Sequence, residues 1–442
     1  MRGFEQEGLS LPQEPIRRLT APFERFLHVE AASGIVLLVA TLAALILANS
    51  PLSQSFLGFW KTEIGFRIGS IEMAHSLKHW INDGLMAIFF FIIGMEVKRE
   101  LVVGELRDPR RAALPVFAAI GGMVAPALIY LSLQFGMPGE RGWGIPMATD
   151  IAFVVGCMAI LGSRVPHGLR VLLLALAIAD DIGAILVIAI GYTESIDLTA
   201  LLLALGGVVV IYGMSRVGIR SLLAYFFVGF FVWLGFHESG VHATLAGVLL
   251  GLLTPTGSYV SPGIFGELLQ RASEVFHGGA WDQQAERGAR VLRFRWAVRE
   301  TVPPVEYLEA LLHPWVSFVI IPVFALANAG VPLELEYVRD PIAWAVAGGL
   351  IVGKPLGILL FSWFAIRLRV ASLPHGVDWG TLLGGGFLAG IGFTMALFIA
   401  GLALPGDLLD AAKVGVLGAS AVAAGIGLFL LSRLLPSRAE EA

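Results

Sequence analysis

The sequence predicts an all-α membrane protein whose chain crosses the bilayer many times. Hydrophobic residues make up 57% of the 442 residues and charged residues only 14%, whereas a soluble domain is roughly one quarter charged. The apolar residues also gather in stretches of roughly 20, the length that a helix needs to span a bilayer. The net charge of −4 and the single cysteine, Cys157, add little, because the charges are unevenly placed and one cysteine forms no internal disulfide.

About twelve such stretches occur along the chain, and several contain Gly or Pro. The predicted spans cover residues 31–48, 75–97, 112–133, 143–162, 169–192, 198–214, 221–236, 241–253, 311–329, 341–366, 381–404 and 411–434. The expected parts of the chain are a cytoplasmic N-terminal segment (1–30), spans one to eight (31–256), a cytoplasmic connection (257–310), spans nine to twelve (311–434) and a cytoplasmic tail (435–442). The first thirty residues carry charge throughout, so no signal peptide is expected.

Lysine and arginine residues predict the orientation, because they favour the cytoplasmic side of a membrane. With twelve spans, one side of the membrane receives Arg17, Arg18, Arg25, Lys98, Arg99, Arg107, Arg110, Arg111, Arg164, Arg170, Arg216, Arg220, Arg367, Arg369, Arg433 and Arg438. The opposite loops are poorer in basic residues, apart from Lys61, Arg67 and Lys78 after the first span. Both termini are therefore predicted to be cytoplasmic.

Two loops are unusual. Residues 61–73 alternate apolar and polar side chains around Gly69-Ser70, which predicts a β-hairpin on the outer face. Residues 257–304 are polar and rich in Arg and Glu, and we expect a cytoplasmic connection that is partly helical or disordered.

Two spans contain similar interruptions. Residues 144–146 read Gly-Ile-Pro and precede Thr149 in the fourth span, and residues 390–392 read Gly-Ile-Gly and precede Thr394 in the eleventh. Interrupted helices at matching places in two halves are typical of transporters with internal repeats. The alternative is that Gly and Pro are simply common in membrane helices.

Three carboxylates fall inside predicted spans: Asp150 in the fourth, and the adjacent pair Asp180 and Asp181 in the centre of the fifth. An ionisable group at this depth costs about 2.5–3.5 kcal/mol, which favours a functional role over packing. Adjacent helix positions point about 100° apart, so we expect one aspartate of the pair to line a site and the other to face a counter-charge. Carboxylate oxygens suit hard cations such as Na+ and Li+, and a proton would compete for the same oxygens.

Two further groups complete this candidate site. Thr149 and Asp150 follow the interruption at Pro146, where an aspartate can accept from free N–H groups and offset the positive end of a half-helix. Lys354 lies deep in the tenth span and needs a counter-charge, for which Asp180 and Asp150 are both candidates. Asp83, Glu96 and His242 are weaker candidates for pH sensing or access, because ordinary interfacial hydrogen bonding or a solvated helix end also accounts for them.

Nine segments of the sequence resemble the NhaA family of bacterial Na+/H+ antiporters. These segments are 80–87 (Trp-Ile-Asn-Asp-Gly-Leu-Met-Ala), 95–101 (Met-Glu-Val-Lys-Arg-Glu-Leu), 146–153 (Pro-Met-Ala-Thr-Asp-Ile-Ala-Phe), 179–183 (Ala-Asp-Asp-Ile-Gly), 239–247 (Ser-Gly-Val-His-Ala-Thr-Leu-Ala-Gly), 313–315 (His-Pro-Trp), 324–330 (Phe-Ala-Leu-Ala-Asn-Ala-Gly), 353–357 (Gly-Lys-Pro-Leu-Gly) and 390–395 (Gly-Ile-Gly-Phe-Thr-Met). The resemblance extends from about residue 31 to 434, and several segments pair rare intramembrane charges with their neighbours.

The resemblance implies a fold of twelve helices with inverted repeats, in which the fourth and eleventh helices are discontinuous and cross in mid-membrane. It implies that Asp180 and Asp181 bind the ion, Na+ or Li+, and the proton. It places Thr149 and Asp150 at the crossing of the broken helices, with Lys354 as the partner charge.

The resemblance also implies a multi-pass protein of the bacterial inner membrane, a homodimer joined partly by the 61–73 hairpin. Such a protein exports Na+ or Li+ against incoming protons, is activated at alkaline pH, and is a transporter with no cofactor, no enzymatic activity and no nucleic-acid partner. Glu309 and His313 match family positions near the cytoplasmic mouth, but Ala310 stands where a second histidine is expected. The connection 257–304 and the extended N-terminus depart from the family.

Two other functions compete with exchange. An intramembrane aspartyl protease needs two carboxylates that face each other and share a proton, whereas Asp180 and Asp181 are adjacent and no Gly-x-Gly-Asp string occurs. A cation channel needs rings of carboxylates or carbonyls along a pore.

The energy source and the stoichiometry of transport can also be predicted. No Gly-rich nucleotide-binding loop occurs in the sequence, so transport would use an ion gradient. Two buried adjacent carboxylates resist being anionic together without a cation between them. We therefore expect two protons to exchange for one cation, which makes transport electrogenic; a single exchanging site would make it electroneutral.

Overall fold

The structure, a computed structural model, describes residues 30–68, 71–193, 196–219, 221–258, 260, 263–267, 270 and 298–435. Much of the expected cytoplasmic connection lies outside these residues, as do nearly all of the expected N-terminal segment and tail.

Helices make up most of the described chain. In order they are α3 (Glu30–Ala48), α4 (Ser53–Trp60), α5 (Leu77–His79), α6 (Met86–Val102), α7 (Pro109–Gln134), α8 (Ile151–Leu161), α9 (His167–Gly191), α10 (Leu198–Val217), α11 (Leu222–Glu238), α12 (Thr244–Leu253), α15 (Pro304–Trp315), α16 (Ile321–Asn328), α17 (Leu335–Arg339), α18 (Pro341–Gly348), α19 (Lys354–Arg367), α20 (Trp379–Ala389), α21 (Phe393–Ala403) and α22 (Gly406–Leu434). Three π-helical stretches, Trp80–Leu85, Val316–Ile320 and Gly349–Gly353, join α5 to α6, α15 to α16 and α18 to α19.

Eight helical segments within the described residues are long and apolar enough to cross a membrane, or up to ten if each of two bent pairs counts as one span. The eight coincide with predicted spans two to six, nine, ten and twelve, and the bent pairs with spans one and eleven. Spans seven and eight fall on the shorter apolar helices α11 and α12. The chain is therefore an all-α polytopic membrane protein, although length and composition alone give fewer spans than the twelve expected.

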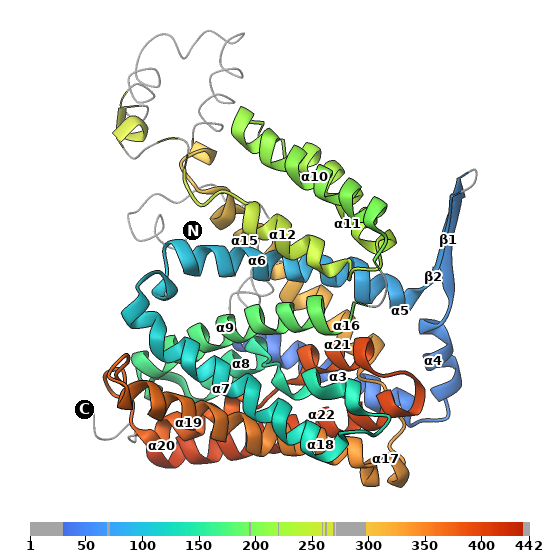
Figure 1. Ribbon diagram of the computed structural model, residues 1–442, viewed down its shortest axis with the longest axis vertical. Helices are drawn as coiled ribbons and strands as arrows, with labels where there is room; N and C mark the ends of the chain where they lie inside the picture. The colour runs from blue at the N-terminus through green and yellow to red at the C-terminus, as the bar shows by residue number, and fades with distance from the viewer. Residues whose placement is uncertain are drawn as a thin grey trace, which may run out of the picture.

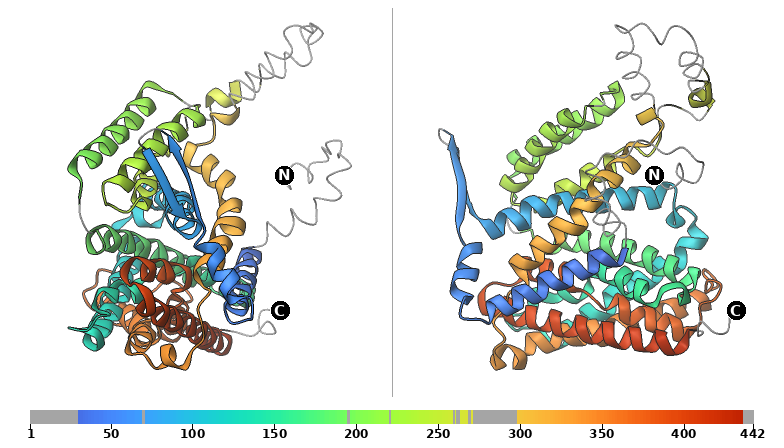
Figure 2. Two further views of the ribbon diagram at one scale, coloured as in Figure 1. Left: turned by 90° about the vertical axis from the view of Figure 1, so that its right-hand side faces the viewer. Right: turned by 180° about the vertical axis from the view of Figure 1, so that it is seen from behind.

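The helices form a bundle in which α10 and α11 lie at one edge and α19, α20 and α22 at the opposite edge (Figures 1 and 2). Between these edges, α9 packs against α6, α7, α8 and α20. These neighbours surround the middle of α9, and Asp180 and Asp181 are therefore buried in the interior of the bundle.

The expected hairpin is present and projects from one end of the bundle (Figure 1). Strand β1 (Glu63–Ile68) pairs antiparallel with β2 (Ile71–Ser76), and Glu63 lies opposite Ser76. The pairing thus continues three residues beyond the expected limit at residue 73.

One boundary differs clearly from the expectation. The connection was expected to reach residue 310, but α15 already begins at Pro304. Proline favours the first turn of a helix, where its missing N–H would have no helical partner. Glu306 and Glu309 lower the hydropathy of this first part of the helix, which is why a search for apolar stretches begins the span too late.

Gly121 in α7 and Gly357 in α19 allow these helices to approach backbone to backbone. A Cβ atom on Gly357 would lie 2.6 Å from the carbonyl carbon of Gly121 and 2.8 Å from the Cβ atom of Ala125. Small residues commonly permit such close packing between membrane helices. The contact holds the first turn of α19, which begins with Lys354, against α7.

We predict that Gly357→Leu destabilises the protein by about 1–3 kcal/mol or more, because the new side chain must displace backbone atoms of α7. The melting temperature in detergent measures this loss. Gly401→Leu is the control, since a Cβ atom on Gly401 meets nothing within 4 Å. An equal effect of both substitutions would contradict a tight contact between α7 and α19.

Candidate functional site

Two helix interruptions meet in the interior of the bundle. In the fourth predicted span, a 3-10 helix (Glu140–Met147) ends and residues 148–150 are not helical before α8 begins. In the eleventh, α20 and α21 are separated by residues 390–392 and bend by 47°. The N–H of Asp150 donates to the carbonyl of Ile391 at 2.7 Å, which joins the two interruptions directly.

Asp150 caps the helices that begin after both interruptions. Its Oδ1 accepts from the N–H of Phe153 in α8 at 3.2 Å. Its Oδ2 accepts from the N–H of Thr394 in α21 at 3.0 Å, and also from the Thr394 hydroxyl. Helix N-termini carry partial positive charge and free N–H groups, so Asp150, only 2% exposed, is compensated by backbone and hydroxyl donors.

Small residues and proline explain why the chain breaks here. Pro146 has no N–H to continue a helix. A Cβ atom on Gly390 would lie 2.6 Å from the carbonyl oxygen of Leu350, and one on Gly392 would lie 3.1 Å from that of Ala148. Glycine at these two positions is what lets the second interruption lie against its neighbours.

Lys354 and Asp180 form an ion pair beside the first interruption. Lys354 Nζ lies 2.5 Å from Asp180 Oδ2 and also donates to the carbonyl of Met147. Both side chains are fully buried. Thr149 Oγ1 lies 2.7 Å from the same Asp180 oxygen and 2.9 Å from the carbonyl of Ala389. The sequence offered Asp180 and Asp150 as possible partners for Lys354, and in the structure Lys354 contacts Asp180.

Asp181 has a different environment from its neighbour. It is 3% exposed, yet within the described part of the chain it forms no hydrogen bond or ion pair. Its neighbour in sequence, Asp180, has a charge of the same sign, and the lysine of the site, Lys354, contacts Asp180 instead. The charge of Asp150 is offset by the N-termini of two helices, and the charge of Asp180 is offset by Lys354. Asp181 is therefore the carboxylate of this site without a fixed counter-charge. A proton or a cation can fill that role.

Asp180 offers a second oxygen to such a cation. Its Oδ1 is buried and has no hydrogen-bond partner among the described residues, whereas Oδ2 is bound by Lys354 and Thr149. Carboxylate oxygens are ligands that a hard monovalent cation prefers.

The other candidate residues lie at the two ends of the bundle. Asp83 lies near the hairpin, 3.5 Å from ring nitrogens of His79 and His237. His242 Nε2 lies 3.1 Å from the carbonyl of Tyr192, a contact of the ordinary interfacial kind.

Glu96, Glu309 and His313 belong to the opposite end. Glu96 is thirteen residues after Asp83 on the same helical segment, a rise of roughly 20 Å. Glu309 pairs with Arg99, one turn beyond Glu96. His313 is one turn beyond Glu309 on α15, with Ser317 Oγ 3.4 Å from its Nδ1.

Thr394 is a site residue that the sequence did not single out. Its role could have been found from the interruptions, because Thr394 follows the second as Thr149 follows the first. Each hydroxyl contacts a buried aspartate, Thr149 with Asp180 and Thr394 with Asp150.

Known proteins resemble this chain over nearly its whole length. Residues 24–431 match the family model described as Na+/H+ antiporter 1. A protein of Rhodopirellula baltica named Na(+)/H(+) antiporter NhaA is 58% identical over 428 residues, 97% of this chain and 97% of its own. A Na(+)/H(+) antiporter NhaA of Rhizobium meliloti is 53% identical over 96% and 97%, and Na(+)/H(+) antiporter NhaA 2 of Acidiphilium cryptum is 52% identical over 97% and 95%.

We predict that Lys354→Ala lowers the free energy of unfolding by about 3–5 kcal/mol, because it leaves the Asp180 carboxylate buried without its partner. The melting temperature in detergent measures the change, with Leu360→Ala, a 60% exposed position on the same helix, as control. The double variant Lys354→Met/Asp180→Asn should recover much of the loss, since both charges are gone. Equal melting temperatures for Lys354→Ala and Leu360→Ala would contradict the ion pair.

Proposed function

The chain belongs to the Na+/H+ antiporter 1 family, and we propose that it exchanges Na+ or Li+ for protons at Asp181, with Asp180 as the second ligand. The observation that carries this proposal is the uncompensated Asp181 carboxylate beside the Asp180–Lys354 ion pair. A buried carboxylate without a counter-charge is stable only with a bound proton or cation. The two occupants exclude each other, and that exclusion couples their transport.

The exchange cycle follows from this competition. With the site open to the proton-rich side, a proton occupies Asp181, and Lys354 pairs with the Asp180 carboxylate. With the site open to the other side, Na+ binds Asp181 and the free oxygen of Asp180, and the proton of Asp181 leaves. Because Na+ competes with Lys354 for Asp180, we propose that a second proton leaves as well, from the remaining carboxyl or from the released lysine.

Two protons for one Na+ make the exchange electrogenic. One net positive charge then moves inward in each cycle, which is worth about 2.3 kcal/mol per 100 mV. The negative potential inside a bacterium would therefore help to drive Na+ out.

We further propose the finer architecture of the family: twelve spans with inverted repeats, of which the fourth and eleventh are discontinuous. The matching interruptions at residues 148–150 and 390–392, and the two threonines that follow the same pattern, support it. The arrangement gives a reason for the charges, because half-helix ends in mid-membrane expose dipoles that Asp150 and Lys354 offset.

The placement of the protein is also proposed from its charges and its hairpin. Basic residues at the loops opposite the hairpin support an inner-membrane protein with cytoplasmic termini. The hairpin projects free of the bundle (Figure 1), and its strand edges are available to pair with a second copy, which supports a homodimer. Glu96, Glu309 and His313 at the other end are proposed to take part in activation by alkaline pH.

The contacts of the aspartates favour exchange over proteolysis. A protease needs the two carboxyl groups to share one proton, but Asp180 Oδ2 contacts Lys354 and Thr149 instead.

We expect Asp181→Asn to abolish exchange and leave folding intact, because an amide neither titrates nor supplies an anionic oxygen. Sodium-induced pH change in proteoliposomes, followed over a pH series, measures exchange. Asp108→Asn, at an exposed N-cap of α7, is the matched control and should retain exchange. Sodium-dependent proton movement by Asp181→Asn at the control rate would rule out this site.

The stoichiometry predicts a dependence on voltage. With the potential in proteoliposomes clamped by potassium and valinomycin, and the pH gradient fixed, sodium efflux should accelerate as the interior becomes more negative. Rates that do not respond to the potential would exclude two protons per cation, although not exchange itself.

A further inference from the structure

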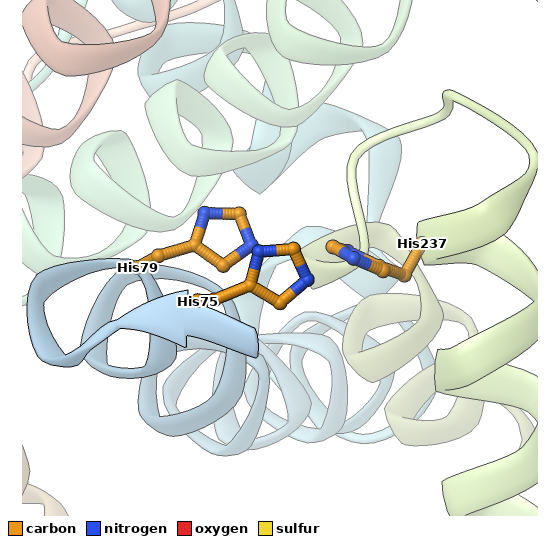
Figure 3. A group of neighbouring side chains, drawn as sticks. All are labelled: His75, His79 and His237. Atoms are coloured by element: carbon orange, nitrogen blue, oxygen red, sulfur yellow. The ribbon is translucent and has the colours of Figure 1, made fainter. Parts of the chain in front are cut away.

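Three histidine side chains meet where the hairpin joins the bundle (Figure 3). His75 lies near the end of β2, His79 ends α5, and His237 lies in the last turn of α11. Each offers a ring nitrogen, and these nitrogens all lie within 4.8 Å of one another. Figure 3 shows the rings of His75 and His79 overlapping, with His237 approaching from the facing helix.

An acidic side chain completes the group. Asp83 Oδ2 lies 3.5 Å from His79 Nε2 and 3.5 Å from His237 Nδ1. In a tetrahedral zinc site with Zn–N distances near 2.05 Å, neighbouring ligand atoms are about 3.4 Å apart. The two distances from Asp83 are therefore already close to the spacing of metal ligands. The three histidine nitrogens, which lie within 4.8 Å of one another, need to approach one another by at most about 1.4 Å to reach the same spacing.

The sequence spacing and the packing hold these groups in place. His79 and Asp83 are four residues apart on one helical segment, Leu77–Val102, which places their side chains on one face. His75 precedes this segment at the end of β2. His237 stacks on Trp233 with an angle of 12° between the rings. Trp233 Nε1 in turn donates to the carbonyl of Asp83 at 3.1 Å, so α11 is attached to the segment that carries the other ligands.

One ring nitrogen of the histidine group is buried without a hydrogen-bond partner among the described residues. His79 Nε2 is shielded from solvent and has no hydrogen-bond partner within the described residues. Buried polar atoms are nearly always satisfied, so this one calls for an explanation. The three histidines as a whole are only partly buried, which leaves a route by which an ion can enter.

We propose that His75, His79, His237 and Asp83 bind a divalent transition-metal ion of the zinc class and thereby fasten the base of the hairpin to α11. Imidazole nitrogens with one carboxylate suit Zn2+ and Co2+, whereas Na+, Mg2+ and Ca2+ prefer sites made of oxygen alone. The site lies apart from the aspartate pair and does not depend on the exchange proposed there.

The test measures metal bound to the purified full chain, carrying no polyhistidine tag and stripped with a chelator. After incubation with Zn2+ and removal of unbound ion, elemental analysis should find one zinc per chain. Zn2+ at a hundredfold excess over its dissociation constant should raise the melting temperature by about 3–5 °C, and Mg2+ or Ca2+ should not. Co2+ should give the visible absorption bands of a tetrahedral complex.

Two variants and a control locate the ion. His237→Ala and Asp83→Asn should each weaken zinc binding at least about tenfold. Asp83→Asn is nearly isosteric, so it covers the case in which loss of the Trp233 stack disturbs folding in His237→Ala. His375→Ala, at an exposed histidine elsewhere, should keep the zinc. Absence of bound zinc in the unaltered chain, or retention of zinc by both variants, would overturn the proposal, as would equal loss in His375→Ala, which would mark the zinc as adventitious.

Discussion

The ion pair between Lys354 and Asp180 is the interaction on which the functional site depends. Both side chains are fully buried, and Lys354 also binds the carbonyl of Met147 at the end of a broken helix. By neutralising one aspartate, the lysine leaves its neighbour Asp181 as a carboxylate without a fixed partner. In the proposed exchange, this excess of buried negative charge is what a proton or a cation neutralises in alternation.

The architecture around the pair is arranged to tolerate these charges. Asp150 caps the starts of both α8 and α21 with its two oxygens, so the positive ends of two half-helices face one carboxylate. Gly121 and Gly357 bring α7 and α19 into backbone contact beside Lys354. The carbonyls at the two interruptions are likewise bound, that of Met147 by Lys354, that of Ala389 by Thr149 and that of Ile391 by the N–H of Asp150.

From the sequence, the class of fold and the residues that meet in the interior of the bundle could be predicted, but not the contacts between those residues. Apolar stretches located the helices, because burial in lipid and hydropathy measure the same property. The predicted start of the ninth span, residue 311, lies seven residues after the first residue of α15, Pro304. The difference arises because Glu306 and Glu309 make the first turns of this helix polar. The cost of buried charge singled out Asp150, Asp180, Asp181 and Lys354, but spacing alone could not choose the partner of Lys354. That choice depends on how segments 174 residues apart pack together. The histidine group was not predicted for the same reason, because His237 is far from His75 and His79 in the sequence.

The central claim is that sodium and protons compete for Asp181, and sodium binding to the purified protein tests it most directly. Isothermal titration with NaCl over a pH series gives the apparent dissociation constant at each pH. Competition predicts that this constant rises as the pH falls, by about tenfold per pH unit for each proton displaced. It also predicts that protons are released as sodium binds, which buffers with different ionisation enthalpies would reveal. A sodium affinity that stays constant across the series, with no proton release, would contradict the account.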